Sequence, residues 1–488
     1  MGFAACHRLL SGSHRGRRDR LAKLPMIAMN DNRRIDSKIL RDFYGISPVT
    51  LDLWEKQTPG GPPGFFRFGS NLVCYGQSAG GASHDFRQSS DYDASNSVQV
   101  TGSGIYLPFE FSAVIENLRR ERYVKQLYGD KAIAKNWLVW KAYYAVREIL
   151  PVGIRRPLQK AYFKDWEQLP FPSWPVDFTA DFLHEELLKL VMKAQGQNRI
   201  PFIWFWPDGA AACAILTHDV ETAAGRDFSS KLMDMDVSHG FKASFQVIPE
   251  TRYAVPQSYW DEIRSRGFEF NVHDINHDGY LFHSKSEFER RAKLINHYVR
   301  KYGAQGFRAG SMYRNVEWYN LFEFSYDMSV PNVAHLEPQR GGCCTVMPYF
   351  VGDILELPLT TVQDYSVFNI LDEYSIDLWK KQTELILKRN GLISFLSHPD
   401  YLIDLKSRGV YESLLSYLRD VCDGHNVWHA LPGDVNRWWR ARNSMELVRV
   451  SNVWQIQGPE SHRARVAYAT LDGDRIEYSV ESAPVHSD

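Results

Sequence analysis

Two pairs of side chains in this sequence have types and spacings that could bind one metal ion. Asp219 and Glu221 stand two positions apart in the run THDVE, and His273 and His277 stand four positions apart in the run HDINH. Carboxylate oxygens and imidazole nitrogens are ligands of catalytic zinc, which keeps a position open for water or substrate. If residues 273–277 turn helically, both imidazoles lie on one face and can reach one ion. The ordinary alternatives are an acidic helix cap and histidines that pack in a core.

Arg308 and His398 are two further polar residues that follow apolar stretches. Arg308 lies in the run FRAG, where a guanidinium could orient a carboxylate through bidentate hydrogen bonds or form an ordinary salt bridge. His398 lies in the run SHPD, and an imidazole titrates near neutral pH, which suits a general acid. Its alternative is a strand-end histidine that only bonds to the backbone. None of these motifs decides a function alone.

Each of the four motifs follows a predicted strand. From residue 210 on, short apolar runs alternate with stretches of helical periodicity, which indicates a parallel sheet, and this many repeats favour a closed or nearly closed (β/α) barrel. Catalytic groups of such barrels lie at the carboxyl ends of the strands, so the motifs should meet at one rim. The predicted strands are 213–217, 243–248, 268–272, 306–308, 329–331, 355–359, 392–396 and 427–431. The predicted helices are 229–239, 258–266, 286–302, 376–388 and 411–422.

In this order, the motifs resemble those of the polysaccharide deacetylases with a NodB-homology domain, carbohydrate esterase family 4 and its relatives. That family carries a Thr-Phe-Asp-Asp motif, a His-x-x-x-His motif, an arginine-containing third motif and a late strand that ends in His. The resemblance covers residues 205–435, and its counterparts are Thr217 with Asp219, His273 with His277, Arg308, and Leu396-Ser397-His398. It implies an α/β fold with a NodB-like distorted (β/α) barrel.

The sequence also departs from the family's pattern. Val220 stands where the family has its second Asp, the metal carboxylate, and Glu221 follows one residue later. Either Glu221 takes that role and Asp219 is the base, or Asp219 binds the metal and Glu221 is the base. The third motif has Ala309 in place of the usual Pro. The fourth motif has two candidates, Asp364 and Glu356.

The resemblance implies a metal-dependent hydrolase that acts on C–N bonds other than peptide bonds. Its cofactor is a divalent ion, zinc in the first place, with cobalt, nickel or manganese as alternatives. The ion polarises an acetamide carbonyl and lowers the pKa of its water to about 7. Asp219 takes the water's proton, Arg308 orients Asp219, a backbone N–H of residues 311–313 stabilises the oxyanion, and His398 protonates the departing amine. The implied metal ligands are His273, His277 and Glu221, and the implied catalytic residues are Asp219, Arg308 and His398.

The implied substrate is a carbohydrate that carries an N-acetyl or O-acetyl group, a glycan or an intermediate of glycan biosynthesis. Two other functions remain open. The first is an amidohydrolase that acts on a non-carbohydrate amide from the same barrel. The second is an inactive or metal-free carbohydrate-binding relative, which Val220 favours. Decay of a site would not be expected to spare both histidines, the arginine and His398, and this convergence favours catalysis.

The chain outside the barrel is divided by composition. Residues 1–35 are basic and predicted to be disordered, residues 36–200 form an accessory α/β domain, residues 205–440 form the barrel, and residues 445–488 form a small β appendage. In the accessory domain we predict strands at 65–69 and 72–76 and helices at 110–128, 132–149 and 178–195.

The composition excludes several classes of protein. Acidic and basic residues nearly cancel, with a formal net charge of -1 over 488 residues, so no nucleic-acid partner is expected. The most apolar stretch, 200–216, is interrupted by proline and aspartate and cannot span a membrane. The six cysteines have no CxxC spacing, and the adjacent Cys343 and Cys344 favour a reducing compartment. The basic start of the sequence lacks the apolar core of a secretory signal. We therefore expect a cytoplasmic protein, and the sequence indicates no oligomeric state.

Overall fold

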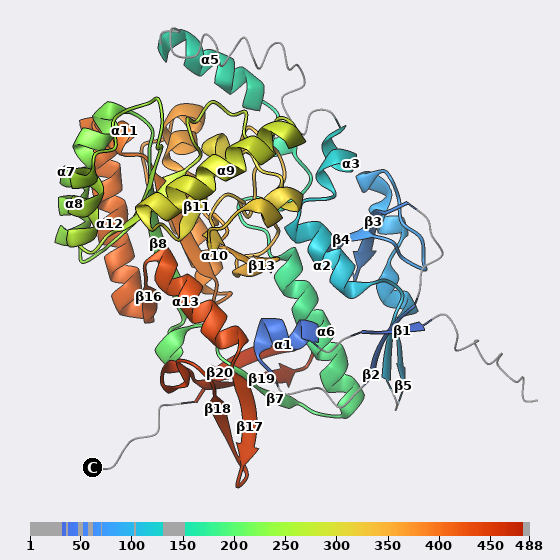
Figure 1. Cartoon of the computed structure of the whole chain (residues 1–488). Helices are drawn as coiled ribbons and strands as arrows, with labels where there is room; N and C mark the ends of the chain where they lie inside the picture. Colours follow the sequence, from blue (N-terminus) through green and yellow to red (C-terminus); the bar gives the residue numbers. More distant parts are fainter. Residues whose placement is uncertain are drawn as a thin grey trace, which may run out of the picture.

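The computed structural model of the chain describes residues 32–35, 38–46, 52–56, 62–69, 71–101, 104–129 and 152–481. Its largest sheet has nine strands and curls into a half-barrel that is parallel except at one edge (Figure 1). The strand order is β13-β14-β12-β11-β10-β9-β8-β15, with β16 beside the first part of β8 and β13 antiparallel to β14. The bounds are β8 Ala212–Val220, β9 Ser244–Val247, β10 Glu269–His273, β11 Gly306–Arg308, β12 Tyr326–Asp327, β13 Tyr349–Val351, β14 Ile354–Glu356, β15 Leu392–Ser397 and β16 Val427–His429. The predicted NodB-like α/β barrel is confirmed.

The free edge of β15 is partly covered by chain that follows β14 and runs beside β15 without forming a full strand. Thr361 N donates to Ser394 O at 3.3 Å, and Thr360 Oγ1 donates to Leu392 O at 2.8 Å. These bonds satisfy part of the free edge of β15, which would otherwise leave buried backbone groups without partners.

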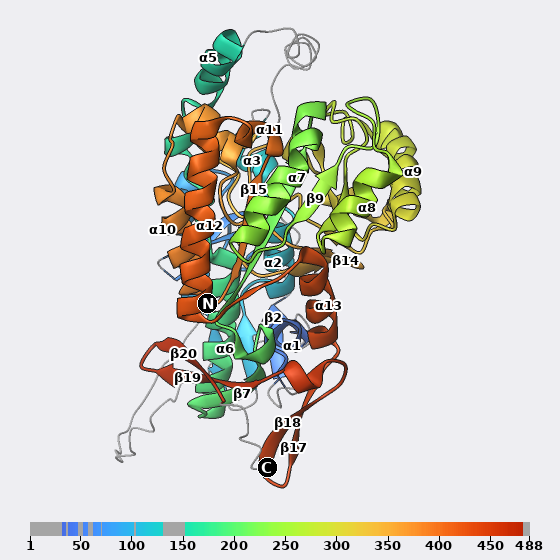
Figure 2. The ribbon, with the colours of Figure 1, turned by 90° about the vertical axis from the view of Figure 1, so that its left-hand side faces the viewer.

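Helices alternate with the strands and cover the outside of the sheet (Figures 1 and 2). Side chains cap three of them: Thr222 accepts from Gly225 N at the start of α7, Ser284 begins α9, and Asp404 begins α12. The helices of this part are α7 Ala223–Ser238, α8 Gln257–Ser265, α9 Lys285–Tyr302, α10 Asp377–Leu387, α11 Pro399–Leu402, α12 Leu405–His425 and α13 Pro432–Asn443. In the described ranges no helix is long and apolar enough to cross a membrane.

The β8 strand is the central strand of the site, and all nine of its residues are buried. Side chains of a strand alternate between its two faces, so Asp219 and the following Glu221 share one side while Val220 points to the other. Val220 packs in the hydrophobic cluster with Leu232 and Phe245. The strand therefore places two acidic side chains toward the interior of the barrel rim.

The N-terminal and C-terminal parts share one core. Strand β19 lies between β20 and β7 in a three-stranded sheet, so the C-terminal strands are joined to the segment that precedes β8. The hydroxyls of Tyr44 and Tyr478 are 3.0 Å apart, and Phe202 and Phe205 pack beside them. The bounds of these elements are β1 Asn32–Ile35, α1 Lys38–Tyr44, β2 Asp52–Lys56, β3 Gly64–Phe68, β4 Leu72–Gly76, β5 Gln99–Thr101, β6 Gly104–Leu107, α2 Phe111–Arg119, α3 Val124–Tyr128, α5 Val152–Phe163, α6 Thr179–Gln195, β7 Arg199–Ile203, β17 Glu446–Val450, β18 Val453–Gln457, β19 Val466–Asp472 and β20 Arg475–Val480.

Some predicted elements differ from the structure. The helix predicted over 110–128 is two helices, because the chain turns at Glu121, whose φ is 56°. The strand predicted at 329–331 is wrong: the strand is Tyr326–Asp327, and Pro331 forms only an isolated bridge to Leu359. The predicted helix 132–149 lies outside the described residues, as do nearly all of the predicted disordered residues 1–35.

Candidate metal centre and active site

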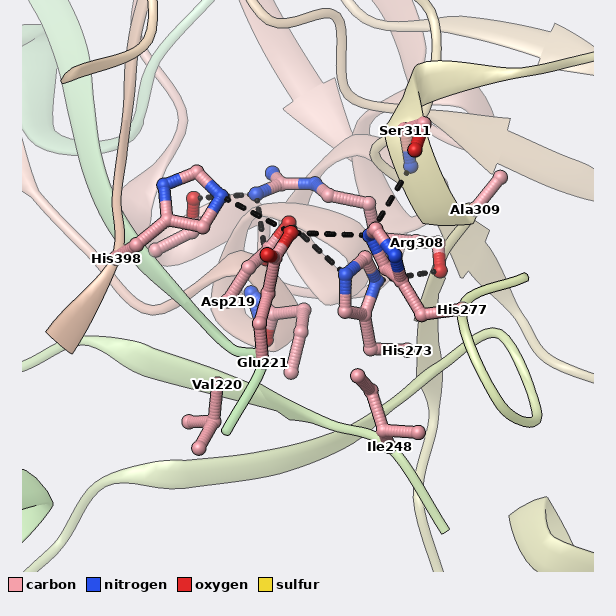
Figure 3. Close-up of polar contacts among 12 residues, drawn as sticks. Asp219, Val220, Glu221, Ile248, His273, His277, Arg308, Ala309, Ser311 and His398 are labelled. Atoms are coloured by element: carbon pink, nitrogen blue, oxygen red, sulfur yellow. Dashed lines mark hydrogen bonds and ion pairs between the residues drawn. The ribbon is translucent and has the colours of Figure 1, made fainter. Parts of the chain in front are cut away.

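Asp219 lies near the end of β8 and pairs with Arg308 at the end of β11 (Figure 3). Arg308 Nη1 donates to Asp219 Oδ1 at 3.0 Å and to Thr217 Oγ1 at 2.9 Å, and Arg308 Nε donates to Met328 O at 2.9 Å. Of the two expected arrangements, the bidentate one is not formed: Nη1 alone bonds to Asp219, and Nη2 has no hydrogen-bond partner among the described residues. Both charged groups are buried, so the arginine fixes the direction of the Asp219 carboxylate.

His273 ends β10, and His277 lies in the loop that follows it. Segment 273–277 does not meet the condition of a helical turn, because Asp274 and His277 have φ angles of 52° and 53° and the segment forms no helix. These two left-handed residues turn the loop back over the end of β10. The two imidazoles nevertheless meet, with ring centroids 4.9 Å apart.

Glu221 completes a group of three side chains that could bind a metal ion (Figure 3). One possible ligand atom from each of Glu221, His273 and His277 lies within 4.8 Å of the other two. Glu221 Oε1 is 3.0 Å from His277 Nε2. Asp219 stands beside this group, with Oδ2 3.6 Å from His273 Nε2.

The chemistry of the donor set fits a divalent ion. His273 Nδ1 is 3.1 Å from Arg308 O, so an N–H at Nδ1 leaves the Nε2 lone pair directed into the group. That Nε2 is buried and has no hydrogen-bond partner in the described part of the chain. Burial lowers the pKa of His273 to about 4, so its ring is neutral at neutral pH, as a metal ligand must be. Two imidazoles and one carboxylate are a ligand set typical of zinc hydrolases.

His398 follows β15 and faces the group from the opposite side (Figure 3). His398 Nδ1 is 2.6 Å from Asp364 Oδ1, the His398 backbone N donates to Asp364 Oδ2 at 2.7 Å, and Nε2 is 3.8 Å from Glu221 Oε1. Burial acts to lower the pKa of His398, but the Asp364 carboxylate outweighs it and raises the pKa to about 10. The ring is therefore protonated at neutral pH. Of the two candidates for the fourth motif, Asp364 contacts His398, whereas Glu356 accepts from Val330 N at 3.0 Å.

Asp400 supports Glu221, a contact that the sequence analysis missed. Its carboxylate accepts from Glu221 N at 3.1 Å and from the Thr222 hydroxyl. A Cβ at Gly225 would lie 2.4 Å from Asp400 Oδ2, so the start of α7 approaches Asp400 closely. The signal in the sequence was the position of Asp400, two residues after His398 in the same run.

A second missed feature is a buried hydrogen-bond network beneath the site. His218 Nδ1 is 2.9 Å from Ser397 Oγ, His218 Nε2 is 3.0 Å from Asp236 Oδ2, and Tyr411 donates to Asp236 Oδ1 at 2.7 Å. The network joins the end of β8 to the end of β15, the strands that carry Asp219 and His398. Its signal was His218, a polar residue where the family has phenylalanine.

We expect Asp236→Ala to lower the free energy of unfolding by roughly 3 kcal/mol, because His218 and the Tyr411 hydroxyl would be left buried without this partner. Denaturant unfolding measures the change. The control is Asp234→Ala on the exposed side of α7, which should change the free energy of unfolding by no more than about 0.5 kcal/mol. Equal effects of the two substitutions would contradict a stabilising role of the network.

Ser311 presents a backbone N–H to the site, within the predicted range 311–313. The Ser311 N–H donates to His277 Nε2 at 3.3 Å (Figure 3). Ser311 and Met312 have φ angles of 55° and 53°. Two consecutive left-handed residues that are not glycine are costly, at about 1–3 kcal/mol each, and such backbone is concentrated at functional sites.

Compared with known proteins, the sequence matches no family profile and no curated protein. Solved structures do match. A Mycobacterium smegmatis protein assigned to the polysaccharide deacetylases is 18% identical, covers 49% of this chain and 93% of its own, and gives a TM-score of 0.40. Puue allantoinase is 12% identical over 48% of this chain and 92% of its own, with a TM-score of 0.38. The Bacillus subtilis peptidoglycan deacetylase PdaC is 12% identical over 48% of this chain and 95% of its own, with a TM-score of 0.31.

Each of these three structures covers about half of this chain. The strand order of the barrel and the order of its motifs identify the fold as the NodB-like barrel of the polysaccharide deacetylases.

Proposed function

We propose that this protein is a metal-dependent hydrolase that removes an acetyl group from a carbohydrate, with zinc as the first candidate for the metal. One observation carries the proposal: Glu221, His273 and His277 form a cluster of three ligands between two groups suited to proton transfer. Asp219 lies 3.6 Å from His273 on one side, and the Nε2 of His398 lies 3.8 Å from Glu221 on the other. A metal site flanked by a base and an acid is one arrangement that can hydrolyse an amide.

In this proposal Glu221, His273 and His277 would hold the metal ion. When bound, the ion would supply a Lewis acid for the substrate carbonyl and would lower the pKa of the attacking water. The site is buried, which strengthens every charge interaction inside it.

The remaining groups divide the proton transfers. Asp219 accepts the proton of the attacking water, and Arg308 holds one of its oxygens so that the other faces the ligand group. The Ser311 N–H donates to His277 Nε2 at 3.3 Å in this structure; once that nitrogen holds a metal ion, the N–H would be released to stabilise the negative charge that develops on the carbonyl oxygen. His398 donates a proton from Nε2 to the departing nitrogen, while Asp364 holds its Nδ1.

The division of roles between the two carboxylates is tested by Asp219→Asn and Glu221→Gln. We expect Asp219→Asn to retain one metal ion per chain and to lose about 10²–10⁴-fold in kcat. We expect Glu221→Gln to bind the metal about 10-fold or more weakly, because a neutral amide oxygen is the poorer ligand. Metal titration followed by steady-state kinetics measures both. The opposite pattern would make Asp219 the ligand and Glu221 the base.

The substrate class is tested by measuring acetate release from N-acetylated sugars, sugar nucleotides and oligosaccharides, with small cyclic and linear amides as the comparison. Release from the sugars supports the proposal. Hydrolysis of small amides alone would identify an amidohydrolase with a non-carbohydrate substrate. Saturable binding of sugars without any hydrolysis by the metal-loaded protein would identify a carbohydrate-binding relative.

A further inference from the structure

The N-terminal part of the chain contacts the loop that follows β11 and carries Ser311. Residues 120–123 join α2 to α3, and their side chains reach residues 314–317. At the surface, Arg120 and Arg122 pair with Glu317 at 3.2 and 2.7 Å. Beneath them, Glu121 and Arg314 form a buried ion pair with side chains that are 6% and 1% exposed.

The Glu121 carboxylate is surrounded by N–H donors. Arg314 Nε donates to Oε2 at 2.6 Å, Arg314 Nη2 donates to Oε1, and Gly342 N donates to Oε1 at 2.6 Å. The Tyr123 hydroxyl also donates to Gly342 O at 2.7 Å. Glu121 itself has a φ of 56°, a conformation that a residue other than glycine adopts at a cost unless its surroundings stabilise it.

Arg314 connects Glu121 to the left-handed turn at Ser311 and Met312 in the site. Its Nη1 donates to Met312 O at 2.8 Å, and its backbone N donates to Gln339 Oε1 at 2.9 Å. The Met312 carbonyl belongs to the left-handed pair Ser311–Met312, whose Ser311 N–H donates to His277 Nε2 at 3.3 Å. On the other side of the turn, a Cβ at Gly310 would lie 3.1 Å from His277 Cδ2, so the turn packs directly on this histidine. The backbone conformation at Ser311 is thus held from both sides.

We propose that Glu121 and Arg314 are positioning residues of the site: the N-terminal part of the chain, through this ion pair, holds the turn that aims the Ser311 N–H at the reacting carbonyl. The inference deepens the proposed function and rests on it. It assigns to the N-terminal part a role in completing the active site. Bidentate pairing is essential to that role, because two of the Arg314 nitrogens bind Glu121 while the third binds Met312 O.

The test compares Glu121→Gln and Arg314→Lys with Glu317→Gln in the full-length protein. Gln at 121 turns an NH₂ group toward one of the three donors, and Lys at 314 keeps the charge pair but lacks the nitrogen that reaches Met312. Glu317→Gln is the matched control, because it removes the exposed ion pairs of the same contact and leaves the turn alone.

The first measurement is amide hydrogen exchange of residues 309–314 in the metal-free protein. We expect at least ~10-fold faster exchange there in both test variants, with unchanged exchange in β9 and α9 and in the control. The second measurement is kinetics of the metal-loaded protein. We expect kcat to fall about 10–100-fold, less than the loss of a whole oxyanion donor, while KM changes less than about threefold.

Unchanged exchange at 309–314 in both test variants would overturn the proposal, and so would faster exchange across the whole barrel, which would mean general destabilisation. An unchanged kcat despite locally faster exchange would also overturn it. If the wild-type protein hydrolyses no substrate but exchange rises locally, the proposed function fails while the holding of the turn by Glu121 stands.

Discussion

The double substitution His273→Ala/His277→Ala is expected to abolish metal binding and hydrolysis together. Both imidazoles belong to the ligand group, and the pKa of His273, lowered to about 4 by burial, keeps its Nε2 available as a neutral ligand. Removal of both leaves Glu221 as the single ligand of the group, and one carboxylate cannot compete with water for the ion. We expect activity to fall to the background rate.

Elemental analysis of the purified protein measures this result. The wild-type chain should carry about one ion, and the double variant should carry none after incubation with zinc, cobalt, nickel or manganese. The control is His283→Ala, an exposed histidine of the same loop, which should keep the full metal content. Full metal content in the double variant would remove the assignment of the ligands. A wild-type chain that binds none of these ions would contradict the proposal of a metal-dependent hydrolase.

The substitution His398→Ala is expected to leave the metal content unchanged and to lower kcat by about 10²–10⁴-fold, the usual contribution of a general acid. His398 stands outside the three-ligand group, and its Nε2 faces that group while Asp364 holds Nδ1. Retention of metal distinguishes this loss of rate from the loss caused by the ligand variants. Full activity in His398→Ala would remove the assignment of the acid.

The variant Asp364→Asn tests the same acid through the dependence of the rate on pH. The Asp364 carboxylate raises the pKa of His398, so the protonated ring is present below this raised pKa and is lost as the pH rises through it. Without the carboxylate the pKa falls, and the alkaline limb of kcat/KM should move to lower pH. Ser366→Ala, close to Asp364 in the chain, should leave the limb in place. An unmoved limb in Asp364→Asn would show that it reports another group.

The sequence by itself determined the barrel and the rim on which the candidate site lies. Short apolar runs between amphipathic stretches predicted the strand at 306–308 with its observed bounds, and predicted β8, β10 and β15 to within a few residues. This succeeds because buried parallel strands are apolar on both faces, so the polar residue that ends each run is conspicuous. Asp219, His273, Arg308 and His398 were found in this way, and Glu221 and His277 by their spacing from Asp219 and His273.

The tertiary structure decided which groups meet. The spacing of Asp219 and Glu221 does not indicate which of them lies closer to the two histidines. In the structure, Glu221 lies in the three-ligand group with the histidines, and Asp219 stands beside that group, paired with Arg308. Asp364 reached His398 from 34 residues away, and no local pattern marks such a contact.

The interruption at Glu121 of the helix predicted over 110–128 also depends on a long-range contact. Local periodicity over 110–128 favours one continuous helix, and helix propensities differ by less than about 1 kcal/mol per residue. A buried ion pair with Arg314, 193 residues away, outweighs that preference and turns the chain toward the site. The sequence therefore determined the strands and the polar residues at their ends, because these follow from local periodicity and burial. The partners of those residues were decided by long-range contacts, because side-chain direction and loop conformation depend on groups that lie far apart in the chain.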